Sequence, residues 1–200
     1  MRRTLSLSAL VLLALTLAVP SNAGDKKKEG GFPAVKRGPE HMVLQSLAGV
    51  YDAKVKLYLD PSGKPMESKG VMTRKMILGG NYLQESFKGE FLGAGFSGIG
   101  IMGFDQKQNK YVTTWVDSMS TSMLQMSGTY NPGKKTFTML GEDYDAGSKK
   151  KMKARDVLKI VSADVQTFEM YRQPEGLPAE IKVMEITFTK RAGKKKESIN

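Results

Sequence analysis

An alternation of apolar and polar residues runs through almost the whole chain and constrains the fold more than any other feature. Between residues 50 and 59, one parity holds Tyr51, Ala53, Val55, Leu57 and Leu59, and the other holds Asp52, Lys54 and Lys56. Successive side chains of a strand point to opposite faces, so this pattern predicts a half-buried strand. Nine further segments are predicted as strands: 67–78, 82–91, 96–104, 110–117, 120–130, 136–142, 151–161, 167–171 and 181–190.

Short turns join these segments, including DPSGKP at 60–65, GGN at 79–81 and NPGK at 131–134. One helix is predicted, starting at Pro39 and ending before Gly49. An uninterrupted antiparallel meander of this length tends to close on itself, because closure removes exposed edges. We therefore predict an all-β fold: an up-and-down antiparallel β-barrel of about ten strands, resembling lipocalins and fatty-acid-binding proteins, with one short N-terminal helix.

The N-terminus, MRRTLSLSALVLLALTLAVPSNA, has two arginines, an apolar run and a small-residue site ending at Ala23. This is the pattern of a secretory signal peptide, and the apolar run is too short to span a bilayer. The expected organisation is a signal peptide at 1–23, a flexible lead-in at 24–38, a single barrel domain at 39–191 and a disordered basic tail at 192–200. The protein is thus expected to be secreted or periplasmic, and soluble after cleavage.

Charge and cysteine content limit the partners. The net charge is +11, and the basic excess lies in runs at 26–28, 149–155 and 190–196. Export argues against nucleic acid, so we expect solvated lysines with weak contacts to anionic surfaces. The chain has no cysteine, so the fold must be held by packing alone, without disulfides.

The segment GAGFSG at 93–98 matches the G-x-G-x-x-G signature of dinucleotide-binding folds. That signature requires a helix directly after it, whose N-terminus binds the pyrophosphate. The following residues, IGIMGFDQKQNKYV, have no helical face. We therefore expect no nucleotide site. Gly98 and Gly100 share the parity of Phe96, and glycine within a strand marks a bulge, a bend or a close approach of another group. A bare inner wall would also leave room for a ligand.

Three segments carry a family resemblance: ILGGNYLQESFKGEF, GFSGIGIMGFDQKQNKYVTTWVDSMST and VMEITFTKR. Over His41 to Arg191 the chain resembles domain-of-unknown-function family 1579, bacterial barrels of lipocalin-like, or calycin-like, shape. The family has no established activity. The chain has Tyr51 where members often have tryptophan, and Asn81 where arginine is common. Related nitrobindin-like barrels bind haem through a histidine in the C-terminal half. Because the only histidine here is His41, the resemblance implies no haem, and we expect no cofactor.

One strand face carries the best candidate for a binding site. Tyr111, Thr113, Trp115 and Asp117 share a face, with Val112, Thr114 and Val116 opposite. If the first face points inward, as we predict, it lines a cavity with an aromatic platform and a carboxylate. If the valine face points inward, the barrel has a filled core. The candidate ligand-binding residues are Trp115, Asp117, Tyr111, Thr113, Gly98, Gly100, Tyr82, Gln84 and Tyr51.

Other chemistry is disfavoured. No G-x-S-x-G elbow surrounds any serine, and the lone His41 is predicted to be structural. Asp143 and Asp145 resemble the start of a calcium loop, but the bidentate glutamate is missing. The methionines at 119, 123 and 126 are predicted to fill the core rather than bind copper. We therefore predict neither catalytic nor metal-binding residues.

The resulting hypothesis is an exported protein that binds a small, partly apolar ligand inside a β-barrel without catalysis. A structural or interaction protein, with a filled barrel and basic tails that contact envelope or partner surfaces, remains an alternative. A hydrolase or isomerase that uses Asp117 is a third. The ligand and the oligomeric state stay open.

Overall fold

The computed structural model describes residues 36–60, 63–145 and 147–192. The predicted signal peptide, nearly all of the lead-in and the tail from 193 onward lie outside these residues. The elements are α1 (Pro39–Ser46), β1 (Gly49–Leu57), β2 (Met66–Ile77), the short 3-10 turn η1 (Leu78–Gly80), β3 (Tyr82–Phe91), β4 (Ala94–Asp105), β5 (Lys110–Asp117), β6 (Leu124–Asn131), β7 (Thr136–Tyr144), β8 (Lys151–Ile160), β9 (Val165–Pro174) and β10 (Ile181–Lys190).

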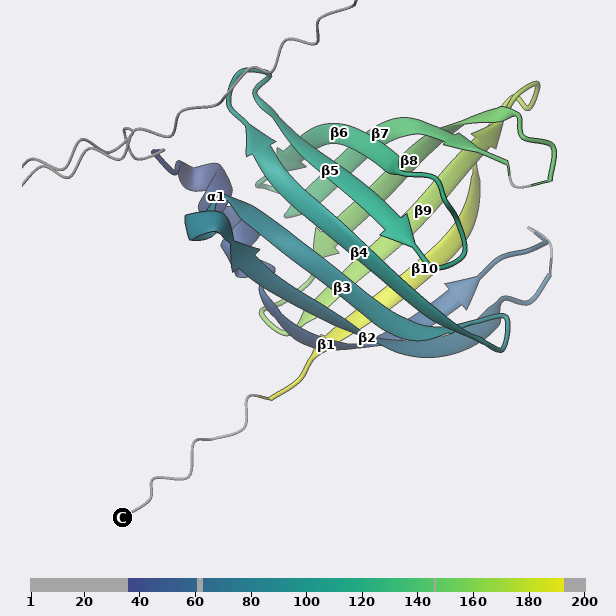
Figure 1. Cartoon of the computed structure of the whole chain (residues 1–200), viewed down its shortest axis with the longest axis horizontal. Coiled ribbons are helices and arrows are strands. Elements are labelled where there is room, and N and C mark those ends of the chain that lie inside the picture. The colour runs from purple at the N-terminus through teal and green to yellow at the C-terminus, as the bar shows by residue number, and fades with distance from the viewer. Residues whose placement is uncertain (1–35, 61–62, 146, 193–200) are drawn as a thin grey trace, which may run out of the picture. The chain divides into compact units, whose positions relative to one another are not determined.

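The ten strands form a closed antiparallel barrel (Figure 1). Each strand pairs with its neighbours in sequence, and β1 pairs with β10 to close the ring. This confirms the predicted fold, including the single short helix at one end. The helix α1 is the only one described that exceeds a single turn, and no helix in the described ranges is long and apolar enough to cross a membrane.

The helix α1 begins where the sequence predicted. Pro39 occupies the first turn, where no intrahelical amide bond is lost. His41 is buried, and its Nδ1 atom accepts a hydrogen bond from the Gly38 amide at 3.1 Å. Its ring also makes a T-shaped contact with Phe104, with ring centroids 6.4 Å apart. His41 therefore fixes the start of the helix, which confirms its structural role.

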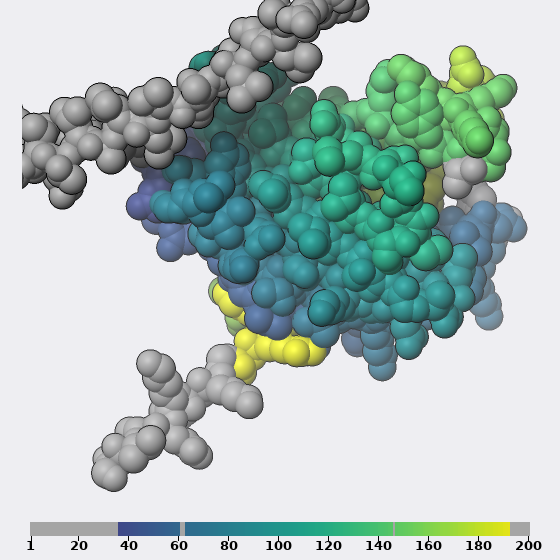
Figure 2. All heavy atoms as spheres, in the orientation of Figure 1, coloured from purple at the N-terminus to yellow at the C-terminus, as the bar shows by residue number. Residues whose placement is uncertain are grey.

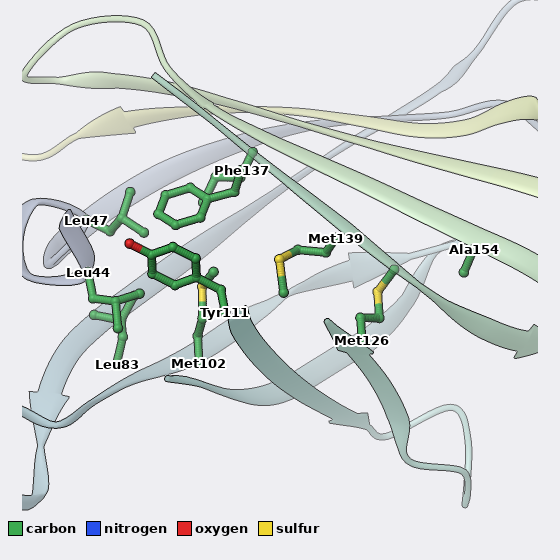
Figure 3. Packing of buried hydrophobic residues seen from close by; sticks show 10 residues of the cluster. Leu44, Leu47, Leu83, Met102, Tyr111, Met126, Phe137, Met139 and Ala154 are labelled. Atoms are coloured by element: carbon green, nitrogen blue, oxygen red, sulfur yellow. The ribbon is translucent and has the colours of Figure 1, made fainter. Parts of the chain in front are cut away.

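The interior near α1 is sealed by apolar packing (Figure 3). Leu44 of α1 and Leu47, which follows directly after the helix, are fully buried among strand side chains that include Leu83, Met102 and Phe137. Tyr111 packs edge-on against Phe137 with ring centroids 4.9 Å apart, and burial raises the pKa of its hydroxyl to about 12. The helix thus closes this end of the barrel as an apolar plug.

Most strand boundaries differ from the prediction by a few residues, and the largest difference is at the start of β6. The strand expected from residue 120 begins at Leu124, because local side-chain bonds turn the chain away beforehand: Asp117 Oδ1 accepts the Met119 amide at 2.9 Å. Met119 and Met123 are consequently exposed, at 56% and 60%, whereas Met126 is buried. The prediction that all three methionines fill the core was wrong for the first two.

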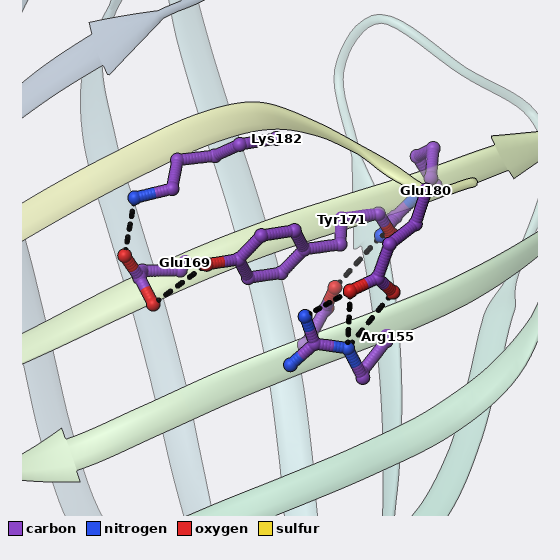
Figure 4. A network of polar contacts seen from close by, with 7 residues as sticks. Arg155, Glu169, Tyr171, Glu180 and Lys182 are labelled. Carbon is purple, nitrogen blue, oxygen red and sulfur yellow. Dashed lines mark hydrogen bonds and ion pairs between the residues drawn. The ribbon is translucent and has the colours of Figure 1, made fainter.

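A charged network covers the outer face of β8, β9 and β10 (Figure 4). Lys182 pairs with Glu169, which also accepts a hydrogen bond from the Tyr171 hydroxyl at 3.0 Å. Arg155 binds Glu180 and lies over the Tyr171 ring, 3.9 Å from its centroid. Hydrogen bonds from Lys182 hold the pKa of Glu169 below its ordinary value, and Arg155 does the same for Glu180.

This network predicts a loss of stability in acid. A carboxylate whose pKa is depressed by folding stabilises the fold above its unfolded pKa, and that contribution is lost as the pH falls. The loss should therefore set in near 4.5, the ordinary glutamate value. Because the partners are partly exposed, we expect Glu169→Gln to reduce the acid dependence of the unfolding free energy by less than about 1 kcal/mol. Urea titrations at several pH values measure the slope of the unfolding free energy against pH.

Glu142→Gln, in the exposed pair with Lys151, is the control and should change this slope less. Equal slopes for wild type and Glu169→Gln would contradict the prediction.

Candidate functional site

The glycines of β4 make room for the only tryptophan. A Cβ atom at Gly98 would overlap Cζ2 of Trp115 and lie 2.8 Å from its Cε2 atom. A Cβ atom at Gly100 would lie 3.0 Å from Cε3 of the same ring. Gly98 and Gly100 pair with Asp117 and Trp115 of β5, so the indole lies across the neighbouring strand. The bare face of the GAGFSG region therefore seats the Trp115 ring, which explains these glycines without a nucleotide.

Asp117 supports this ring. Its Oδ2 atom accepts a hydrogen bond from Trp115 Nε1 at 3.1 Å, and Oδ1 accepts the Met119 amide. Both oxygens are thus engaged by donors that shape the end of β5. A carboxylate held in this way positions Trp115 and the following loop.

A buried polar chain crosses the barrel between Trp115 and α1. Arg74 Nε donates to Glu85 at 2.6 Å, and Arg74 Nη1 donates to Gln166 Oε1 at 2.6 Å. Gln166 in turn donates to the Tyr51 hydroxyl at 2.9 Å. The Tyr51 hydroxyl donates to the Leu47 carbonyl at the end of α1, also at 2.9 Å.

This polar chain has no net charge, because Arg74 is paired with Glu85, and it is packed among aromatic rings. The Arg74 guanidinium lies 4.5 Å from the centroid of the Phe188 ring, which adds a cation–π contact to its ion pair. Burial raises the pKa of the Tyr51 hydroxyl, so it remains a neutral donor at physiological pH. These hydrogen bonds therefore hold the polar chain in one arrangement between α1 and the part of the interior that Trp115 lines.

A second arginine lies toward the other end. Arg172 Nη1 donates to Asp156 Oδ1 at 2.7 Å, and Arg172 Nε donates to Asp143 Oδ2 at 2.9 Å. Its side chain is 5% exposed, and its Nη2 atom is buried without a hydrogen-bond partner. Burial raises the pKa of Asp156 against the opposing effect of the guanidinium. A buried donor that lacks an acceptor is costly, so Nη2 marks a place for an acceptor oxygen.

Burial changes along the barrel axis. Near α1, inward-facing side chains such as Leu83, Phe137 and Phe188 have almost no exposed surface. Farther from α1, inward-facing Met170 and Met184 are only half-buried, as are Trp115 and Phe168, which also packs against the cluster near α1. Phe168 pairs with Leu158 and Ile186 in the middle of its strand, so its exposure is not an effect of the rim. These inward-facing side chains therefore keep some solvent-accessible surface.

Comparisons with known proteins show which family this barrel belongs to and which solved structures share its fold. A family model described as "Protein of unknown function (DUF1579)" matches residues 36–190. The chain belongs to the DUF1579 family. Its fold is similar to Rv2717c from M. tuberculosis, with a TM-score of 0.60 and 12% identity over 78% of this chain and 100% of that one. It is also similar to the S-type phycobiliprotein lyase CPES from Guillardia theta, with a TM-score of 0.52 and 8% identity over 79% and 100% of the two chains. Comparison with curated proteins gives no match.

In this DUF1579 barrel the predicted site residues divide between the two faces. Four of them point inward, as expected: Trp115, Tyr111, Thr113 and Asp117. Gly98 and Gly100 lie beneath the indole. Tyr51 also points inward, into the Arg74 chain. Tyr82 and Gln84 lie on the outer face, where the Tyr82 ring covers Gly103. Their placement in an interior site was wrong, because they have the opposite parity to the buried Leu83.

The sequence pattern did not single out four polar or charged residues that lie inside this DUF1579 barrel. Arg74, Asp156, Gln166 and Arg172 are all buried. Each shares the parity of apolar neighbours in its strand, as Arg172 does with Phe168 and Met170. A charged residue in the apolar register of a strand was the available signal. Within the described residues, no group of three or more His, Cys, Asp or Glu side chains is arranged to hold a metal ion.

Proposed function

We propose that this DUF1579 protein is exported and binds a small, partly apolar molecule inside the barrel, without catalysis. The observation that carries the proposal is the half-buried state of inward-facing Trp115, Phe168, Met170 and Met184. Protein interiors are close-packed, so apolar surface that stays accessible inside the barrel offers contact area to a ligand. Their remaining accessible surface suits a ligand with an apolar body.

Charge narrows the ligand class. Arg74 is paired with Glu85, and Arg172 already contacts both Asp143 and Asp156. A ligand carboxylate near Arg172 would be repelled by these two aspartates, whereas a neutral hydroxyl or carbonyl oxygen would satisfy Nη2 without that repulsion. We therefore favour an uncharged ligand that ends in an acceptor oxygen. The structural likeness to a phycobiliprotein lyase supports a barrel that accommodates small molecules, and does not indicate which ones.

Trp115 reports on binding because it is the only tryptophan. All-trans-retinol is a suitable neutral probe, with retinoic acid as its charged counterpart. We expect retinol to quench Trp115 emission at lower concentration than retinoic acid does. Met170→Phe, which fills the interior, should weaken retinol binding at least about tenfold, a change near 1.4 kcal/mol. Met123→Phe, on the exposed loop, is the matched control and should bind as the wild type does.

Native mass spectrometry of protein purified from its own envelope tests the proposal without choosing a probe. A bound mass is expected. A ligand-free mass, together with Trp115 emission that neither retinoid changes, would overturn the binding function and favour the alternative of a filled structural barrel.

A further inference from the structure

The outer surface of the barrel is divided by charge. Outward-facing positions of β8, β9, β10, β1 and β2 carry many ions, among them Lys153, Arg155, Glu169, Lys54 and Lys69. Between the hairpin ends, the outward-facing positions of β4, β5 and β6 carry none. We call this surface the uncharged face. It is formed by Tyr82, Ile99, Ile101, Val112, Val116 and Leu140.

The uncharged face is exposed and hollowed. Ile99, Ile101 and Leu140 are 48%, 41% and 56% exposed. A hollow of about 610 Å³ is bordered by Ile101, Val112 and Leu140. A second hollow of about 300 Å³ is bordered by Ile99 and Val116, and on its other side by the charged residues Lys88 and Asp117. Figure 2 shows the outer side of β3 to β5, in teal, toward the viewer. Exposed apolar side chains gathered around hollows are typical of an interaction surface.

We propose that the uncharged face binds the same face of a second copy of this chain. A chain with a net charge of +11 repels its own copies, and this repulsion is weakest where the surface carries no charge. A two-fold dimer brings identical patches together, so each must complement itself. Leu140 projects beside the larger hollow and can fill the equivalent hollow of its partner.

The polar residues within this face favour a protein partner over a lipid surface. Gln84, Thr114 and Gln125 lie between the apolar side chains. Their amide and hydroxyl groups are both donors and acceptors, so copies of them can bond to one another across a two-fold axis. Hydrocarbon offers no such partners, and burying these groups against it would cost free energy.

Two further features define the kind of dimer. The barrel has no free strand edge, so copies meet through side chains and not through added strand pairing. From strand spacing, the area across β3 to β7 is on the order of 450 Å² in projection. This is small beside the roughly 800 Å² per partner of a standard interface. We therefore expect a weak, reversible dimer.

Sedimentation velocity from about 1 to about 500 μM tests this dimer directly. The wild-type chain is expected to shift from monomer to dimer mass across this range. Val116→Lys places a positive charge within the uncharged face and should raise the dissociation constant at least about tenfold. Val50→Lys is the matched control, because Val50 is also an outward-facing valine that is 37% exposed, but on the charged half. It should dimerise as the wild type does.

Ile101→Lys gives an independent second variant, and urea unfolding of each monomeric variant checks that its fold is intact. A wild-type chain that stays monomeric throughout the range would overturn the proposal, as would equal dissociation constants for Val116→Lys and Val50→Lys. A monomeric chain that instead sediments with phosphatidylcholine vesicles would assign the face to a lipid surface. Neither result would bear on ligand binding inside the barrel, which Trp115 emission tests separately.

Discussion

Replacing Arg172 by leucine is expected to lower the free energy of unfolding by about 3–5 kcal/mol, because it leaves the buried Asp156 carboxylate without its guanidinium. Breaking one half of a buried pair costs more than removing both partners. The double variant Arg172→Leu with Asp156→Leu should therefore recover most of the loss. Urea unfolding with an unchanged m-value measures both effects.

The control for Arg172 is Arg155→Leu on the neighbouring strand β8. Arg155 pairs with Glu180 on the outer surface, where both side chains are partly exposed, so its loss should cost less than about 1 kcal/mol. Similar losses for the two leucine variants would contradict the prediction.

The Arg172→Leu penalty should also depend on pH. Burial raises the pKa of Asp156, and the variant removes the group that opposed this rise. A group whose pKa is raised in the folded state stabilises the fold below its unfolded pKa and loses that contribution as the pH rises. The penalty should thus grow as the pH rises through the pKa of Asp156 in the folded wild type, which lies above the ordinary aspartate value of 3.8.

Gly98→Ala is expected to destabilise the barrel by about 1–3 kcal/mol, because its methyl group would overlap the Trp115 indole. The ring cannot move freely, since its Nε1 atom is held by Asp117. Thermal or urea unfolding gives the loss, and a change in Trp115 emission would show that the ring has been displaced.

Two comparisons isolate the clash. Gly95→Ala, in the same strand, meets nothing within 4 Å and should be neutral or stabilising by up to about 1 kcal/mol. In a Trp115→Leu background, Gly98→Ala should cost much less than in the wild type. If Gly98→Ala costs as much in both backgrounds, the glycine does not serve to seat the indole.

The barrel could be predicted because strand alternation is a local property. The two faces of β1 differ in polarity at every position from Tyr51 to Lys56, so one face had to be buried. Antiparallel neighbours joined by short turns then left closure as the way to remove free edges. The start of β6 could not be predicted, because it depends on an Asp117 carboxylate that caps the Met119 amide.

The sequence by itself determined the fold class and the helix at Pro39, and it predicted a structural role for His41, since each depends on parity or on neighbouring residues. It favoured an inward direction for Trp115 but left the opposite face open, and the structure decided between them. Only the tertiary structure decided what the interior contains. Arg74 meets Gln166 across 92 positions of the chain, and Arg172 meets Asp143 across 29. Such pairs form because closure of the barrel brings distant strands together around the same space. The pairing of the neighbouring strands β4 and β5 placed the indole over Gly98, so Gly98 serves to seat the Trp115 ring and not to bind a nucleotide.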